Sequence, residues 1–139
     1  MIDGVDHINI YSKGKTMLGR KLSNFCYMPF ICEDGWFASI EAYWFWLGTH
    51  NEDLRPMYGF QAKKFGGSLP KTVEDELFQN KIKKAMRIKA QILKNDLLAS
   101  DLPFKHYYMY GDKVVDAGFE WIVDEWESIR DRLKQEVKA

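Results

Sequence analysis

The sequence predicts an α+β fold, a mainly helical single domain with a small antiparallel sheet. Two long amphipathic stretches predict helices in the middle and at the end of the chain. Two short β-prone runs interrupted by Asp34-Gly35 and by Gly111-Asp112 predict β-hairpins. Helices outweigh strands and the strands do not alternate with helices as β-α-β units, which favours α+β over α/β. A chain of 139 residues without repeats or linkers is typical of one domain, over residues 1–139.

The first part of the chain predicts mainly strands and loops. Residues 8–11 alternate and are β-prone, which predicts a short strand, and residues 12–21 contain two glycines and several cations, which predicts a polar loop. Residues 30–37 predict a hairpin. Its Asp34-Gly35 pair suits a type I′ turn, in which both central residues need a positive φ.

Three helices are predicted in the middle of the chain. Ser39 is the expected N-cap of a helix that runs to about Gly48. A shorter helix is expected over residues 54–65, followed by glycines that can end it. Thr72 is the expected cap of a longer helix over residues 73–94, in which apolar residues recur with helical spacing.

The last third of the chain predicts a hairpin followed by a helix. Residues 107–115 form the expected hairpin, with Gly111 first in the turn, as a type II′ turn requires. A helix is expected over residues 119–136, because its large apolar residues fall on one face.

The composition excludes several functional classes. Twenty cations balance twenty anions, which argues against a wholly basic nucleic-acid binder. The hydrophobic share of 46% excludes a disordered chain. The longest apolar run, residues 36–47, is too short to span a bilayer, and the first residues lack a signal-peptide pattern. Because Cys26 and Cys32 cannot form a disulfide framework, we expect a cytoplasmic protein without a membrane partner.

Charge is segregated along the chain although the total is zero. Residues 81–94 carry cations and no anion, whereas anions dominate residues 116–131. Two solvated helix faces that attract each other would explain this pattern. A cationic face that binds phosphate would explain it as well, and the sequence leaves both interpretations open.

Among the polar residues, Glu41 is the strongest candidate for chemistry. The histidines are far apart and no zinc-type spacing or phosphate-binding loop occurs, so we expect neither a metal nor a cofactor. Glu41 falls in the first turn of the Ser39 helix, within the most aromatic stretch of the chain. A carboxylate among aromatic rings is costly to bury unless paired, and an acid-base role would explain such a position. A helix-terminal acid stabilised by the helix dipole would also explain its position.

Several short segments occur together in a characteristic order. They read Ile-Asn-Ile-Tyr-Ser at residues 8–12, Leu-Ser-Asn-Phe at 22–25, Ser-Ile-Glu-Ala-Tyr at 39–43, Ala-Lys-Lys-Phe-Gly at 62–66 and Ala-Met-Arg-Ile-Lys at 85–89. In this order they resemble the NADAR family, also called YbiA-like N-glycosidases. The resemblance covers roughly residues 7–94. The compact chain suits a phage-encoded member, which would act in the host cytoplasm.

The resemblance implies a mainly helical NADAR-like domain that hydrolyses a bond between ribose C1 and a base-type nitrogen. The substrates of the family are ADP-ribose attached to guanine, which would make modified DNA a partner, and ribosylamino-pyrimidine phosphates. Glu41 matches the catalytic glutamate of the family. A glutamate beside the ribose could move protons and stabilise positive charge at C1.

The resemblance also suggests substrate-binding residues, and we add others by their chemistry. The segment before the first hairpin matches the family pocket at Ser23, Asn24 and Phe25. Aromatic side chains near Glu41 in sequence could stack on a base, namely Trp36, Phe37 and Trp44. Cations beside the motifs could contact phosphate, namely Arg20, Lys63 and Lys64.

The chain departs from the family after Glu41. The family continues with a histidine and later a lysine, whereas this chain has Ala42 and Gly48 at those positions. Three alternatives follow: Lys63 or Lys64 replaces the lysine, Glu41 acts without it, or the domain is a catalytically weak module that binds a nucleotide or ADP-ribose. A protein-interaction domain that uses its charged faces is a further alternative.

Overall fold

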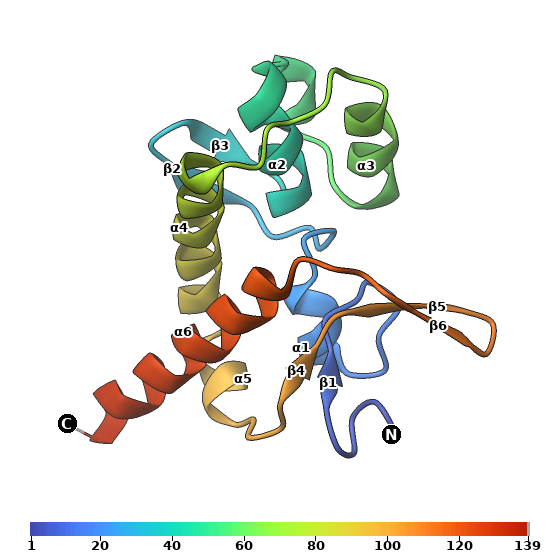
Figure 1. The fold of residues 1–139 in the computed structure, drawn as a ribbon. Helices are drawn as coiled ribbons and strands as arrows, with labels where there is room; N and C mark the ends of the chain where they lie inside the picture. The colour runs from blue at the N-terminus through green and yellow to red at the C-terminus, as the bar shows by residue number, and fades with distance from the viewer. Residues whose placement is uncertain (139) are drawn as a thin grey trace. The chain divides into compact units, whose positions relative to one another are not determined.

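The computed structural model describes residues 1–138, which divide into two compact units (Figure 1). Unit 1 contains residues 1–23 and 90–138, and unit 2 contains residues 24–89. Six α-helices and three two-stranded sheets within the described residues confirm the α+β class. The single domain and its likeness to the NADAR family stay predictions.

Unit 2 begins with the predicted hairpin, formed by β2 (Phe30–Cys32) and β3 (Gly35–Phe37). Cys32 pairs with Gly35, so the two turn residues are Glu33 and Asp34. Gly35 follows them with a φ of +105°, and neither turn residue has a positive φ. The predicted type I′ turn is therefore wrong, because the positive φ belongs to Gly35, the residue after the two turn residues.

The helix α2 (Ile40–Thr49) follows directly and confirms Ser39 as its cap. The Ser39 Oγ accepts a hydrogen bond of 3.1 Å from the backbone nitrogen of Ala42. Most of the helix is buried, because an aromatic core packs on it. The core rings, with centroids 4.7 to 6.3 Å apart, are those of Phe30, Phe37, Tyr43 and Trp46.

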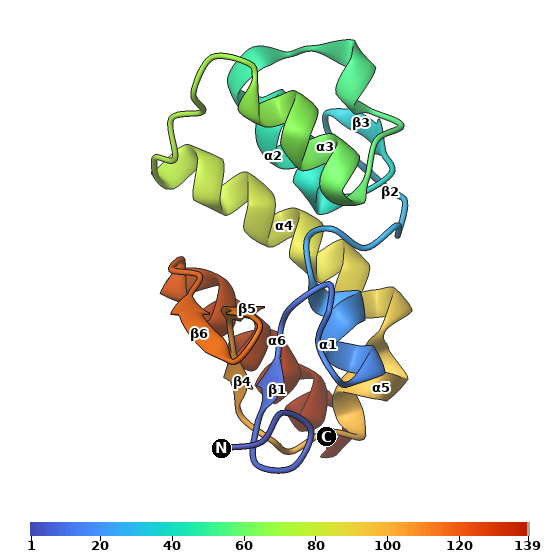
Figure 2. The same ribbon diagram turned by 90° about the vertical axis from the view of Figure 1, so that its right-hand side faces the viewer.

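A short 3-10 turn, η1 (Glu52–Leu54), leads to α3 (Gly59–Gly67), which starts later than the predicted helix. The helices α2 and α3 lie side by side (Figure 2). A Cβ added to Gly66 would lie 2.1 Å from the Cγ of Phe45, so only glycine permits this close approach. This contact holds α3 against the helix that carries Glu41.

The helix α4 (Glu76–Ile92) begins after the predicted position, and the prediction of Thr72 as its cap is wrong. Asp75 is the cap, since its Oδ1 accepts a 2.9 Å hydrogen bond from the nitrogen of Phe78. Thr72 is instead buried against Gly48, where a Cβ would lie 2.8 Å from the Thr72 Cα. The segment before α4 is thus packed on the end of α2.

Unit 1 contains a parallel strand pair in addition to the predicted elements. The strand β1 (Ile8–Asn9) pairs with β4 (Phe104–Lys105), which follows α5 (Lys94–Leu98). The Asn9 side chain extends this pairing, because its Nδ2 donates to the Tyr107 carbonyl at 2.9 Å. The predicted strand at residues 8–11 is therefore confirmed, but shorter.

The polar loop predicted over residues 12–21 is wrong in its second half, which forms α1 (Met17–Leu22). Thr16 caps this helix by accepting a hydrogen bond from the nitrogen of Gly19. A Cβ at Gly19 would lie 2.2 Å from the Asn9 carbonyl oxygen. The glycine therefore serves close packing of helix on strand, not flexibility.

The last elements confirm the predicted order of hairpin and helix. The strands β5 (Tyr107–Tyr110) and β6 (Lys113–Asp116) flank a turn in which Gly111 has a φ of +60° and Asp112 has no positive φ, as in a type II′ turn. The helix α6 (Glu120–Lys138) buries one apolar face. No helix in residues 1–138 is long and apolar enough to span a membrane.

Substitution of Gly66 by alanine tests the contact between α2 and α3. The new methyl group would overlap the Phe45 ring, so we expect the free energy of unfolding to fall by about 1 to 3 kcal/mol. Gly67→Ala is the matched control, because a Cβ there meets no atom within 4 Å. We expect the control to be neutral or slightly stabilising in urea denaturation. Equal stability of the two variants would contradict the close packing.

Candidate functional site

Glu41 lies in the first turn of α2, beside the segment that precedes the hairpin. Its backbone nitrogen donates a 3.0 Å hydrogen bond to the carbonyl oxygen of Asn24. The Ser39 cap fixes the turn, and the Ser39 hydroxyl also donates to the Met57 carbonyl at 3.0 Å. The structure thus brings Asn24 and Glu41 together from positions 17 residues apart in sequence.

The carboxyl group of Glu41 is largely surrounded by protein but keeps some exposure to solvent. Burial raises its pKa from the usual 4.5 to about 7, while the charge of Lys63 opposes the shift. Within the described residues its carboxyl oxygens accept no hydrogen bond that would stabilise the charged form. Glu41 therefore holds a proton for much of the time near neutral pH, as a general acid requires.

Lys63 is the cation that acts on Glu41. It lies on α3, and its Nζ is 5.9 Å from the centre of the Phe25 ring. The start of α3 is tied to the same segment, because the nitrogen of Gly59 donates to the Phe25 carbonyl at 2.9 Å. Lys64 is exposed in the last turn of α3 and has no effect on the pKa of Glu41. Of the two predicted lysines, the structure therefore brings Lys63 to Glu41.

Gly48 has a packing role at the position where the family has a lysine. A Cβ at Gly48 would lie 2.6 Å from the Oγ1 of Thr72 and 2.8 Å from its Cα. Because backbone atoms of the Thr72 segment occupy this space, a lysine at residue 48 would displace that segment. Residue 48 therefore supplies no cation to Glu41, whereas Lys63 acts on its pKa.

Two of the three aromatic candidates belong to the core. Phe37 has no exposed surface and is covered by the guanidinium of Arg55, 4.6 Å from its ring centre. Trp44 is buried edge-on against Phe78, with ring centroids 4.7 Å apart. We therefore correct the expectation that Phe37 and Trp44 stack on a base. Trp36 is 39% exposed and keeps a ring surface that a ligand can contact.

Arg20 and Ser23 belong to unit 1, whereas Glu41, Asn24, Phe25 and Lys63 belong to unit 2. The Nη1 of Arg20 donates to the Gly14 carbonyl at 2.8 Å, and Ser23 is buried at the end of α1. The candidate site in unit 2 therefore comprises Asn24, Phe25, Glu41 and Lys63.

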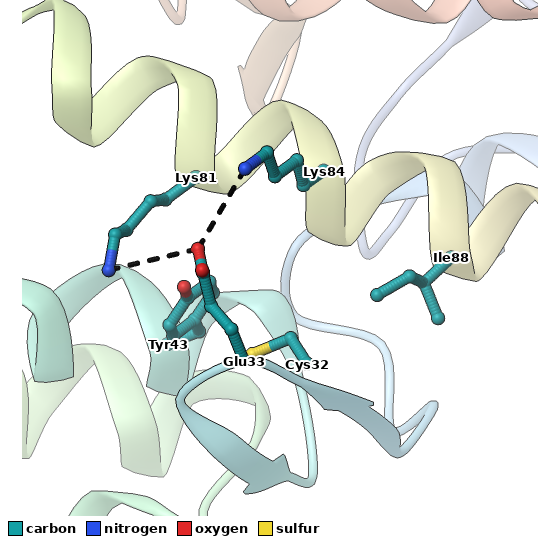
Figure 3. Close-up of a pocket in the computed structure, with 6 residues that line it drawn as sticks. All are labelled: Cys32, Glu33, Tyr43, Lys81, Lys84 and Ile88. Atoms are coloured by element: carbon teal, nitrogen blue, oxygen red, sulfur yellow. Dashed lines mark ion pairs between the residues drawn. The ribbon is translucent and has the colours of Figure 1, made fainter.

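A cavity of about 210 Å³ in unit 2 has a lining that sequence reasoning missed (Figure 3). It lies beside Asp34, which accepts hydrogen bonds from the Tyr43 hydroxyl at 2.6 Å and from the Lys81 Nζ at 3.0 Å. Burial opposes ionisation, but these two bonds outweigh it and hold the pKa of Asp34 below its usual value. From the sequence, Asp34 was predicted only as a turn residue. Its contact with Lys81 could not be predicted, because the two residues are 47 positions apart.

Lys89 was predicted to lie on a solvated cationic face, but the structure buries it. The side chain is 1% exposed, and burial lowers its pKa from 10.5 to about 8, opposed by the nearby Cys26. The cationic stretch at residues 81–94 therefore does not form one uniform charged surface.

A second cavity, of about 420 Å³, lies in unit 1 between the β5–β6 hairpin and the start of α6. Three carboxylates line it, from Asp116, Glu120 and Asp124, and burial lowers the pKa of His106. One lysine, Lys105, also lines it, but the three carboxylates outnumber this cation and would repel a phosphate. Within the described residues, no group of histidine, cysteine or acidic side chains is arranged to hold a metal ion.

Comparisons of the chain with protein family models, curated proteins and solved structures gave no match. In unit 2, a carboxyl group with a raised pKa, a lysine and an aromatic ring lie near the start of α2. Such a set can donate a proton to a leaving group and attract an anionic substrate.

Because the pKa of Glu41 is raised, we expect the variant Glu41→Gln to become more stable relative to wild type as the pH rises. Between pH 4.5 and about 7 the folded protein binds this proton more tightly than the unfolded chain does, so the wild type loses stability as the pH rises. Glutamine cannot ionise. We expect the free energy of unfolding of Glu41→Gln, relative to wild type, to rise by about 1 to 3 kcal/mol from pH 4 to pH 8.

Urea denaturation at several pH values measures this difference. Glu74→Gln is the matched control, because Glu74 is an exposed carboxylate in the same unit. If the difference in free energy of unfolding between Glu41→Gln and wild type stays constant with pH, the pKa of Glu41 is not raised in the folded protein.

Proposed function

We propose that the protein is an N-glycosidase, a hydrolase that cleaves the bond between ribose C1 and a nitrogen of a base. The substrate is an ADP-ribose or ribose-phosphate adduct, such as ADP-ribose on guanine in nucleic acid or a ribosylamino-pyrimidine phosphate. The observation that carries the proposal is the Glu41 carboxyl group, with a pKa of about 7, beside Lys63. The resemblance of the surrounding segments to the NADAR family supports the same chemistry.

The reaction needs one group that first donates and then accepts a proton. The protonated Glu41 carboxyl donates its proton to the leaving nitrogen as the C1–N bond breaks. The resulting carboxylate stabilises the positive charge that develops at C1. Water then attacks C1 and gives its proton to Glu41, which restores the starting state.

Lys63 supports this cycle by its charge. It stabilises the Glu41 carboxylate after proton transfer, which agrees with its lowering effect on the Glu41 pKa. The same ammonium can also form a charge-assisted hydrogen bond with a substrate phosphate. Its positive charge would offset the repulsion between that phosphate and the Glu41 carboxylate. In this proposal Glu41 acts with the charge of Lys63 and without the lysine of the family, whose position is Gly48 in this chain.

A catalytically weak module that binds a nucleotide or ADP-ribose is the second candidate. The observation that favours it is the packing of Gly48 on Thr72, which leaves no space for the lysine of the family. Such a module would bind the same ligands through Lys63 without cleaving them.

Substitution of Glu41 by glutamine tests the hydrolase. Wild type and Glu41→Gln are incubated with DNA that carries ADP-ribosylated guanine and with a ribosylamino-pyrimidine phosphate, and released sugar is measured. We expect the variant to lose about 100-fold or more of the turnover, because glutamine keeps the size but cannot donate the proton. The wild-type rate should fall as the pH rises above about 7, when Glu41 loses its proton. Unchanged turnover in the variant would exclude Glu41 as the acid.

A pair of lysine variants separates binding from catalysis. Lys63→Ala should weaken binding of ADP-ribose about tenfold, whereas Lys64→Ala, a neighbouring exposed lysine, should bind nearly as wild type. Titration at two salt concentrations distinguishes the ligands, since affinity for modified DNA should fall steeply with salt and affinity for a free nucleotide only slightly. Binding without sugar release in the wild type would favour the binding module. Equal affinities of the two variants would remove Lys63 from the site.

A further inference from the structure

The turn of the β2–β3 hairpin places the side chain of Glu33 between two lysines of α4. One carboxylate oxygen, Oε1, lies 3.9 Å from the Nζ of Lys81 and 3.9 Å from the Nζ of Lys84 (Figure 3). The two lysines are three residues apart and therefore project from neighbouring turns of the helix. All three side chains line the cavity of about 210 Å³.

Glu33 is held weakly in this position. Both contacts exceed hydrogen-bond distance, and the side chain is 55% exposed. Its neighbour Asp34 is 19% exposed and is held by Tyr43 and Lys81 through hydrogen bonds. Because Asp34 anchors the turn, the Glu33 side chain can rotate into solvent without movement of the hairpin backbone.

We propose that this cavity binds the phosphate group of a small phosphate ester, which replaces the Glu33 carboxylate between Lys81 and Lys84. A position that already holds a carboxylate between two ammonium groups is suited to an anion. A phosphate carries more charge and more acceptor oxygens than a carboxylate, so it forms stronger charge-assisted hydrogen bonds with the same lysines.

The walls of the cavity indicate the size of the ester. Tyr43, Cys32 and Ile88 provide its less charged surfaces. Burial and the hydrogen bond to Asp34 raise the pKa of Tyr43, so its hydroxyl stays protonated. The volume of about 210 Å³ lies below the range typical of larger ligands, which favours a phosphate with a sugar over a dinucleotide.

This phosphate site is separate from the site at Glu41. Residues 41 and 43 of α2 are about 200° apart around the helix axis, so their side chains leave it in nearly opposite directions. Tyr43 contacts Asp34 of the hairpin, whereas Glu41 is influenced by Lys63 of α3. The inference therefore does not depend on the proposed hydrolase.

Removal of the Glu33 charge tests the exchange. Glu33→Gln should bind inorganic phosphate and ribose 5-phosphate about three- to tenfold more tightly than wild type, because the competing carboxylate charge is gone. Glu74→Gln changes the net charge equally but lies outside the cavity, so its affinity should equal that of wild type. Isothermal titration calorimetry measures the affinities, and circular dichroism verifies that each variant is folded.

Removal of a lysine gives the opposite result. Lys84→Met should weaken binding of both probes about tenfold, and Lys71→Met, an exposed lysine outside the cavity, should not. Glu33→Gln and Lys84→Met should change the affinity for inorganic phosphate by the same factors in a Glu41→Gln background, which keeps this test independent of the hydrolase. Equal tightening by Glu33→Gln and Glu74→Gln, or no tightening by Glu33→Gln, would overturn the proposal. Tighter binding of single-stranded DNA than of ribose 5-phosphate at the same lysines would also overturn it, in favour of nucleic acid.

Discussion

Arg55 holds the β2–β3 hairpin against α2. Its Nη1 donates hydrogen bonds to the carbonyls of Asp34 at 2.9 Å and Trp36 at 3.2 Å. The guanidinium also lies over two aromatic rings, 4.6 Å from the centre of Phe37 and 4.9 Å from that of Trp46. Cation–π contacts of this kind contribute about 0.5 to 2 kcal/mol each, depending on desolvation. One side chain thus joins the turn, the strand and the helix.

The position of Glu41 depends on this clamp through the chain that connects the two elements. The nitrogen of Ala38 donates to the Arg55 carbonyl at 2.8 Å, which fixes the strand end. The next residue, Ser39, then meets both the Met57 carbonyl and the first turn of α2. Glu41 is therefore placed by backbone and capping hydrogen bonds, so the direction of its side chain does not depend on a flexible loop.

The predictions that the structure confirms are those governed by local chemistry. A serine before an apolar helix can accept a hydrogen bond from the first helical turn, and a glycine first in a two-residue turn can adopt a positive φ. Ser39 and Gly111 could therefore be assigned from the sequence. Two of the failures come from contacts distant in sequence. Gly19 signalled a loop but provides space for the Asn9 carbonyl, and Thr72 resembled a cap but packs on Gly48.

In the candidate site too, local features could be predicted from the sequence, whereas features that depend on distant contacts could not. Strand alternation implies that Trp36 and Phe37 face opposite sides, but the sequence cannot say which side is buried. The burial depends on Arg55, which is 18 residues further along the chain. The lysine beside Glu41 could be proposed from the sequence, whereas its selection over Lys64 required the packing of α3 on Phe45.

The two proposed sites of unit 2 share α2 but need not influence each other. Exchange of Glu33 for a phosphate requires only a side-chain rotation, while Asp34 keeps its hydrogen bonds to Tyr43 and Lys81. Coupling between sites requires an element whose equilibrium both ligands bias. The Arg55 clamp opposes such a change, since moving the hairpin would break its bonds to Asp34 and Trp36 together. We therefore expect a phosphate in the hairpin cavity to leave the geometry at Glu41 unchanged.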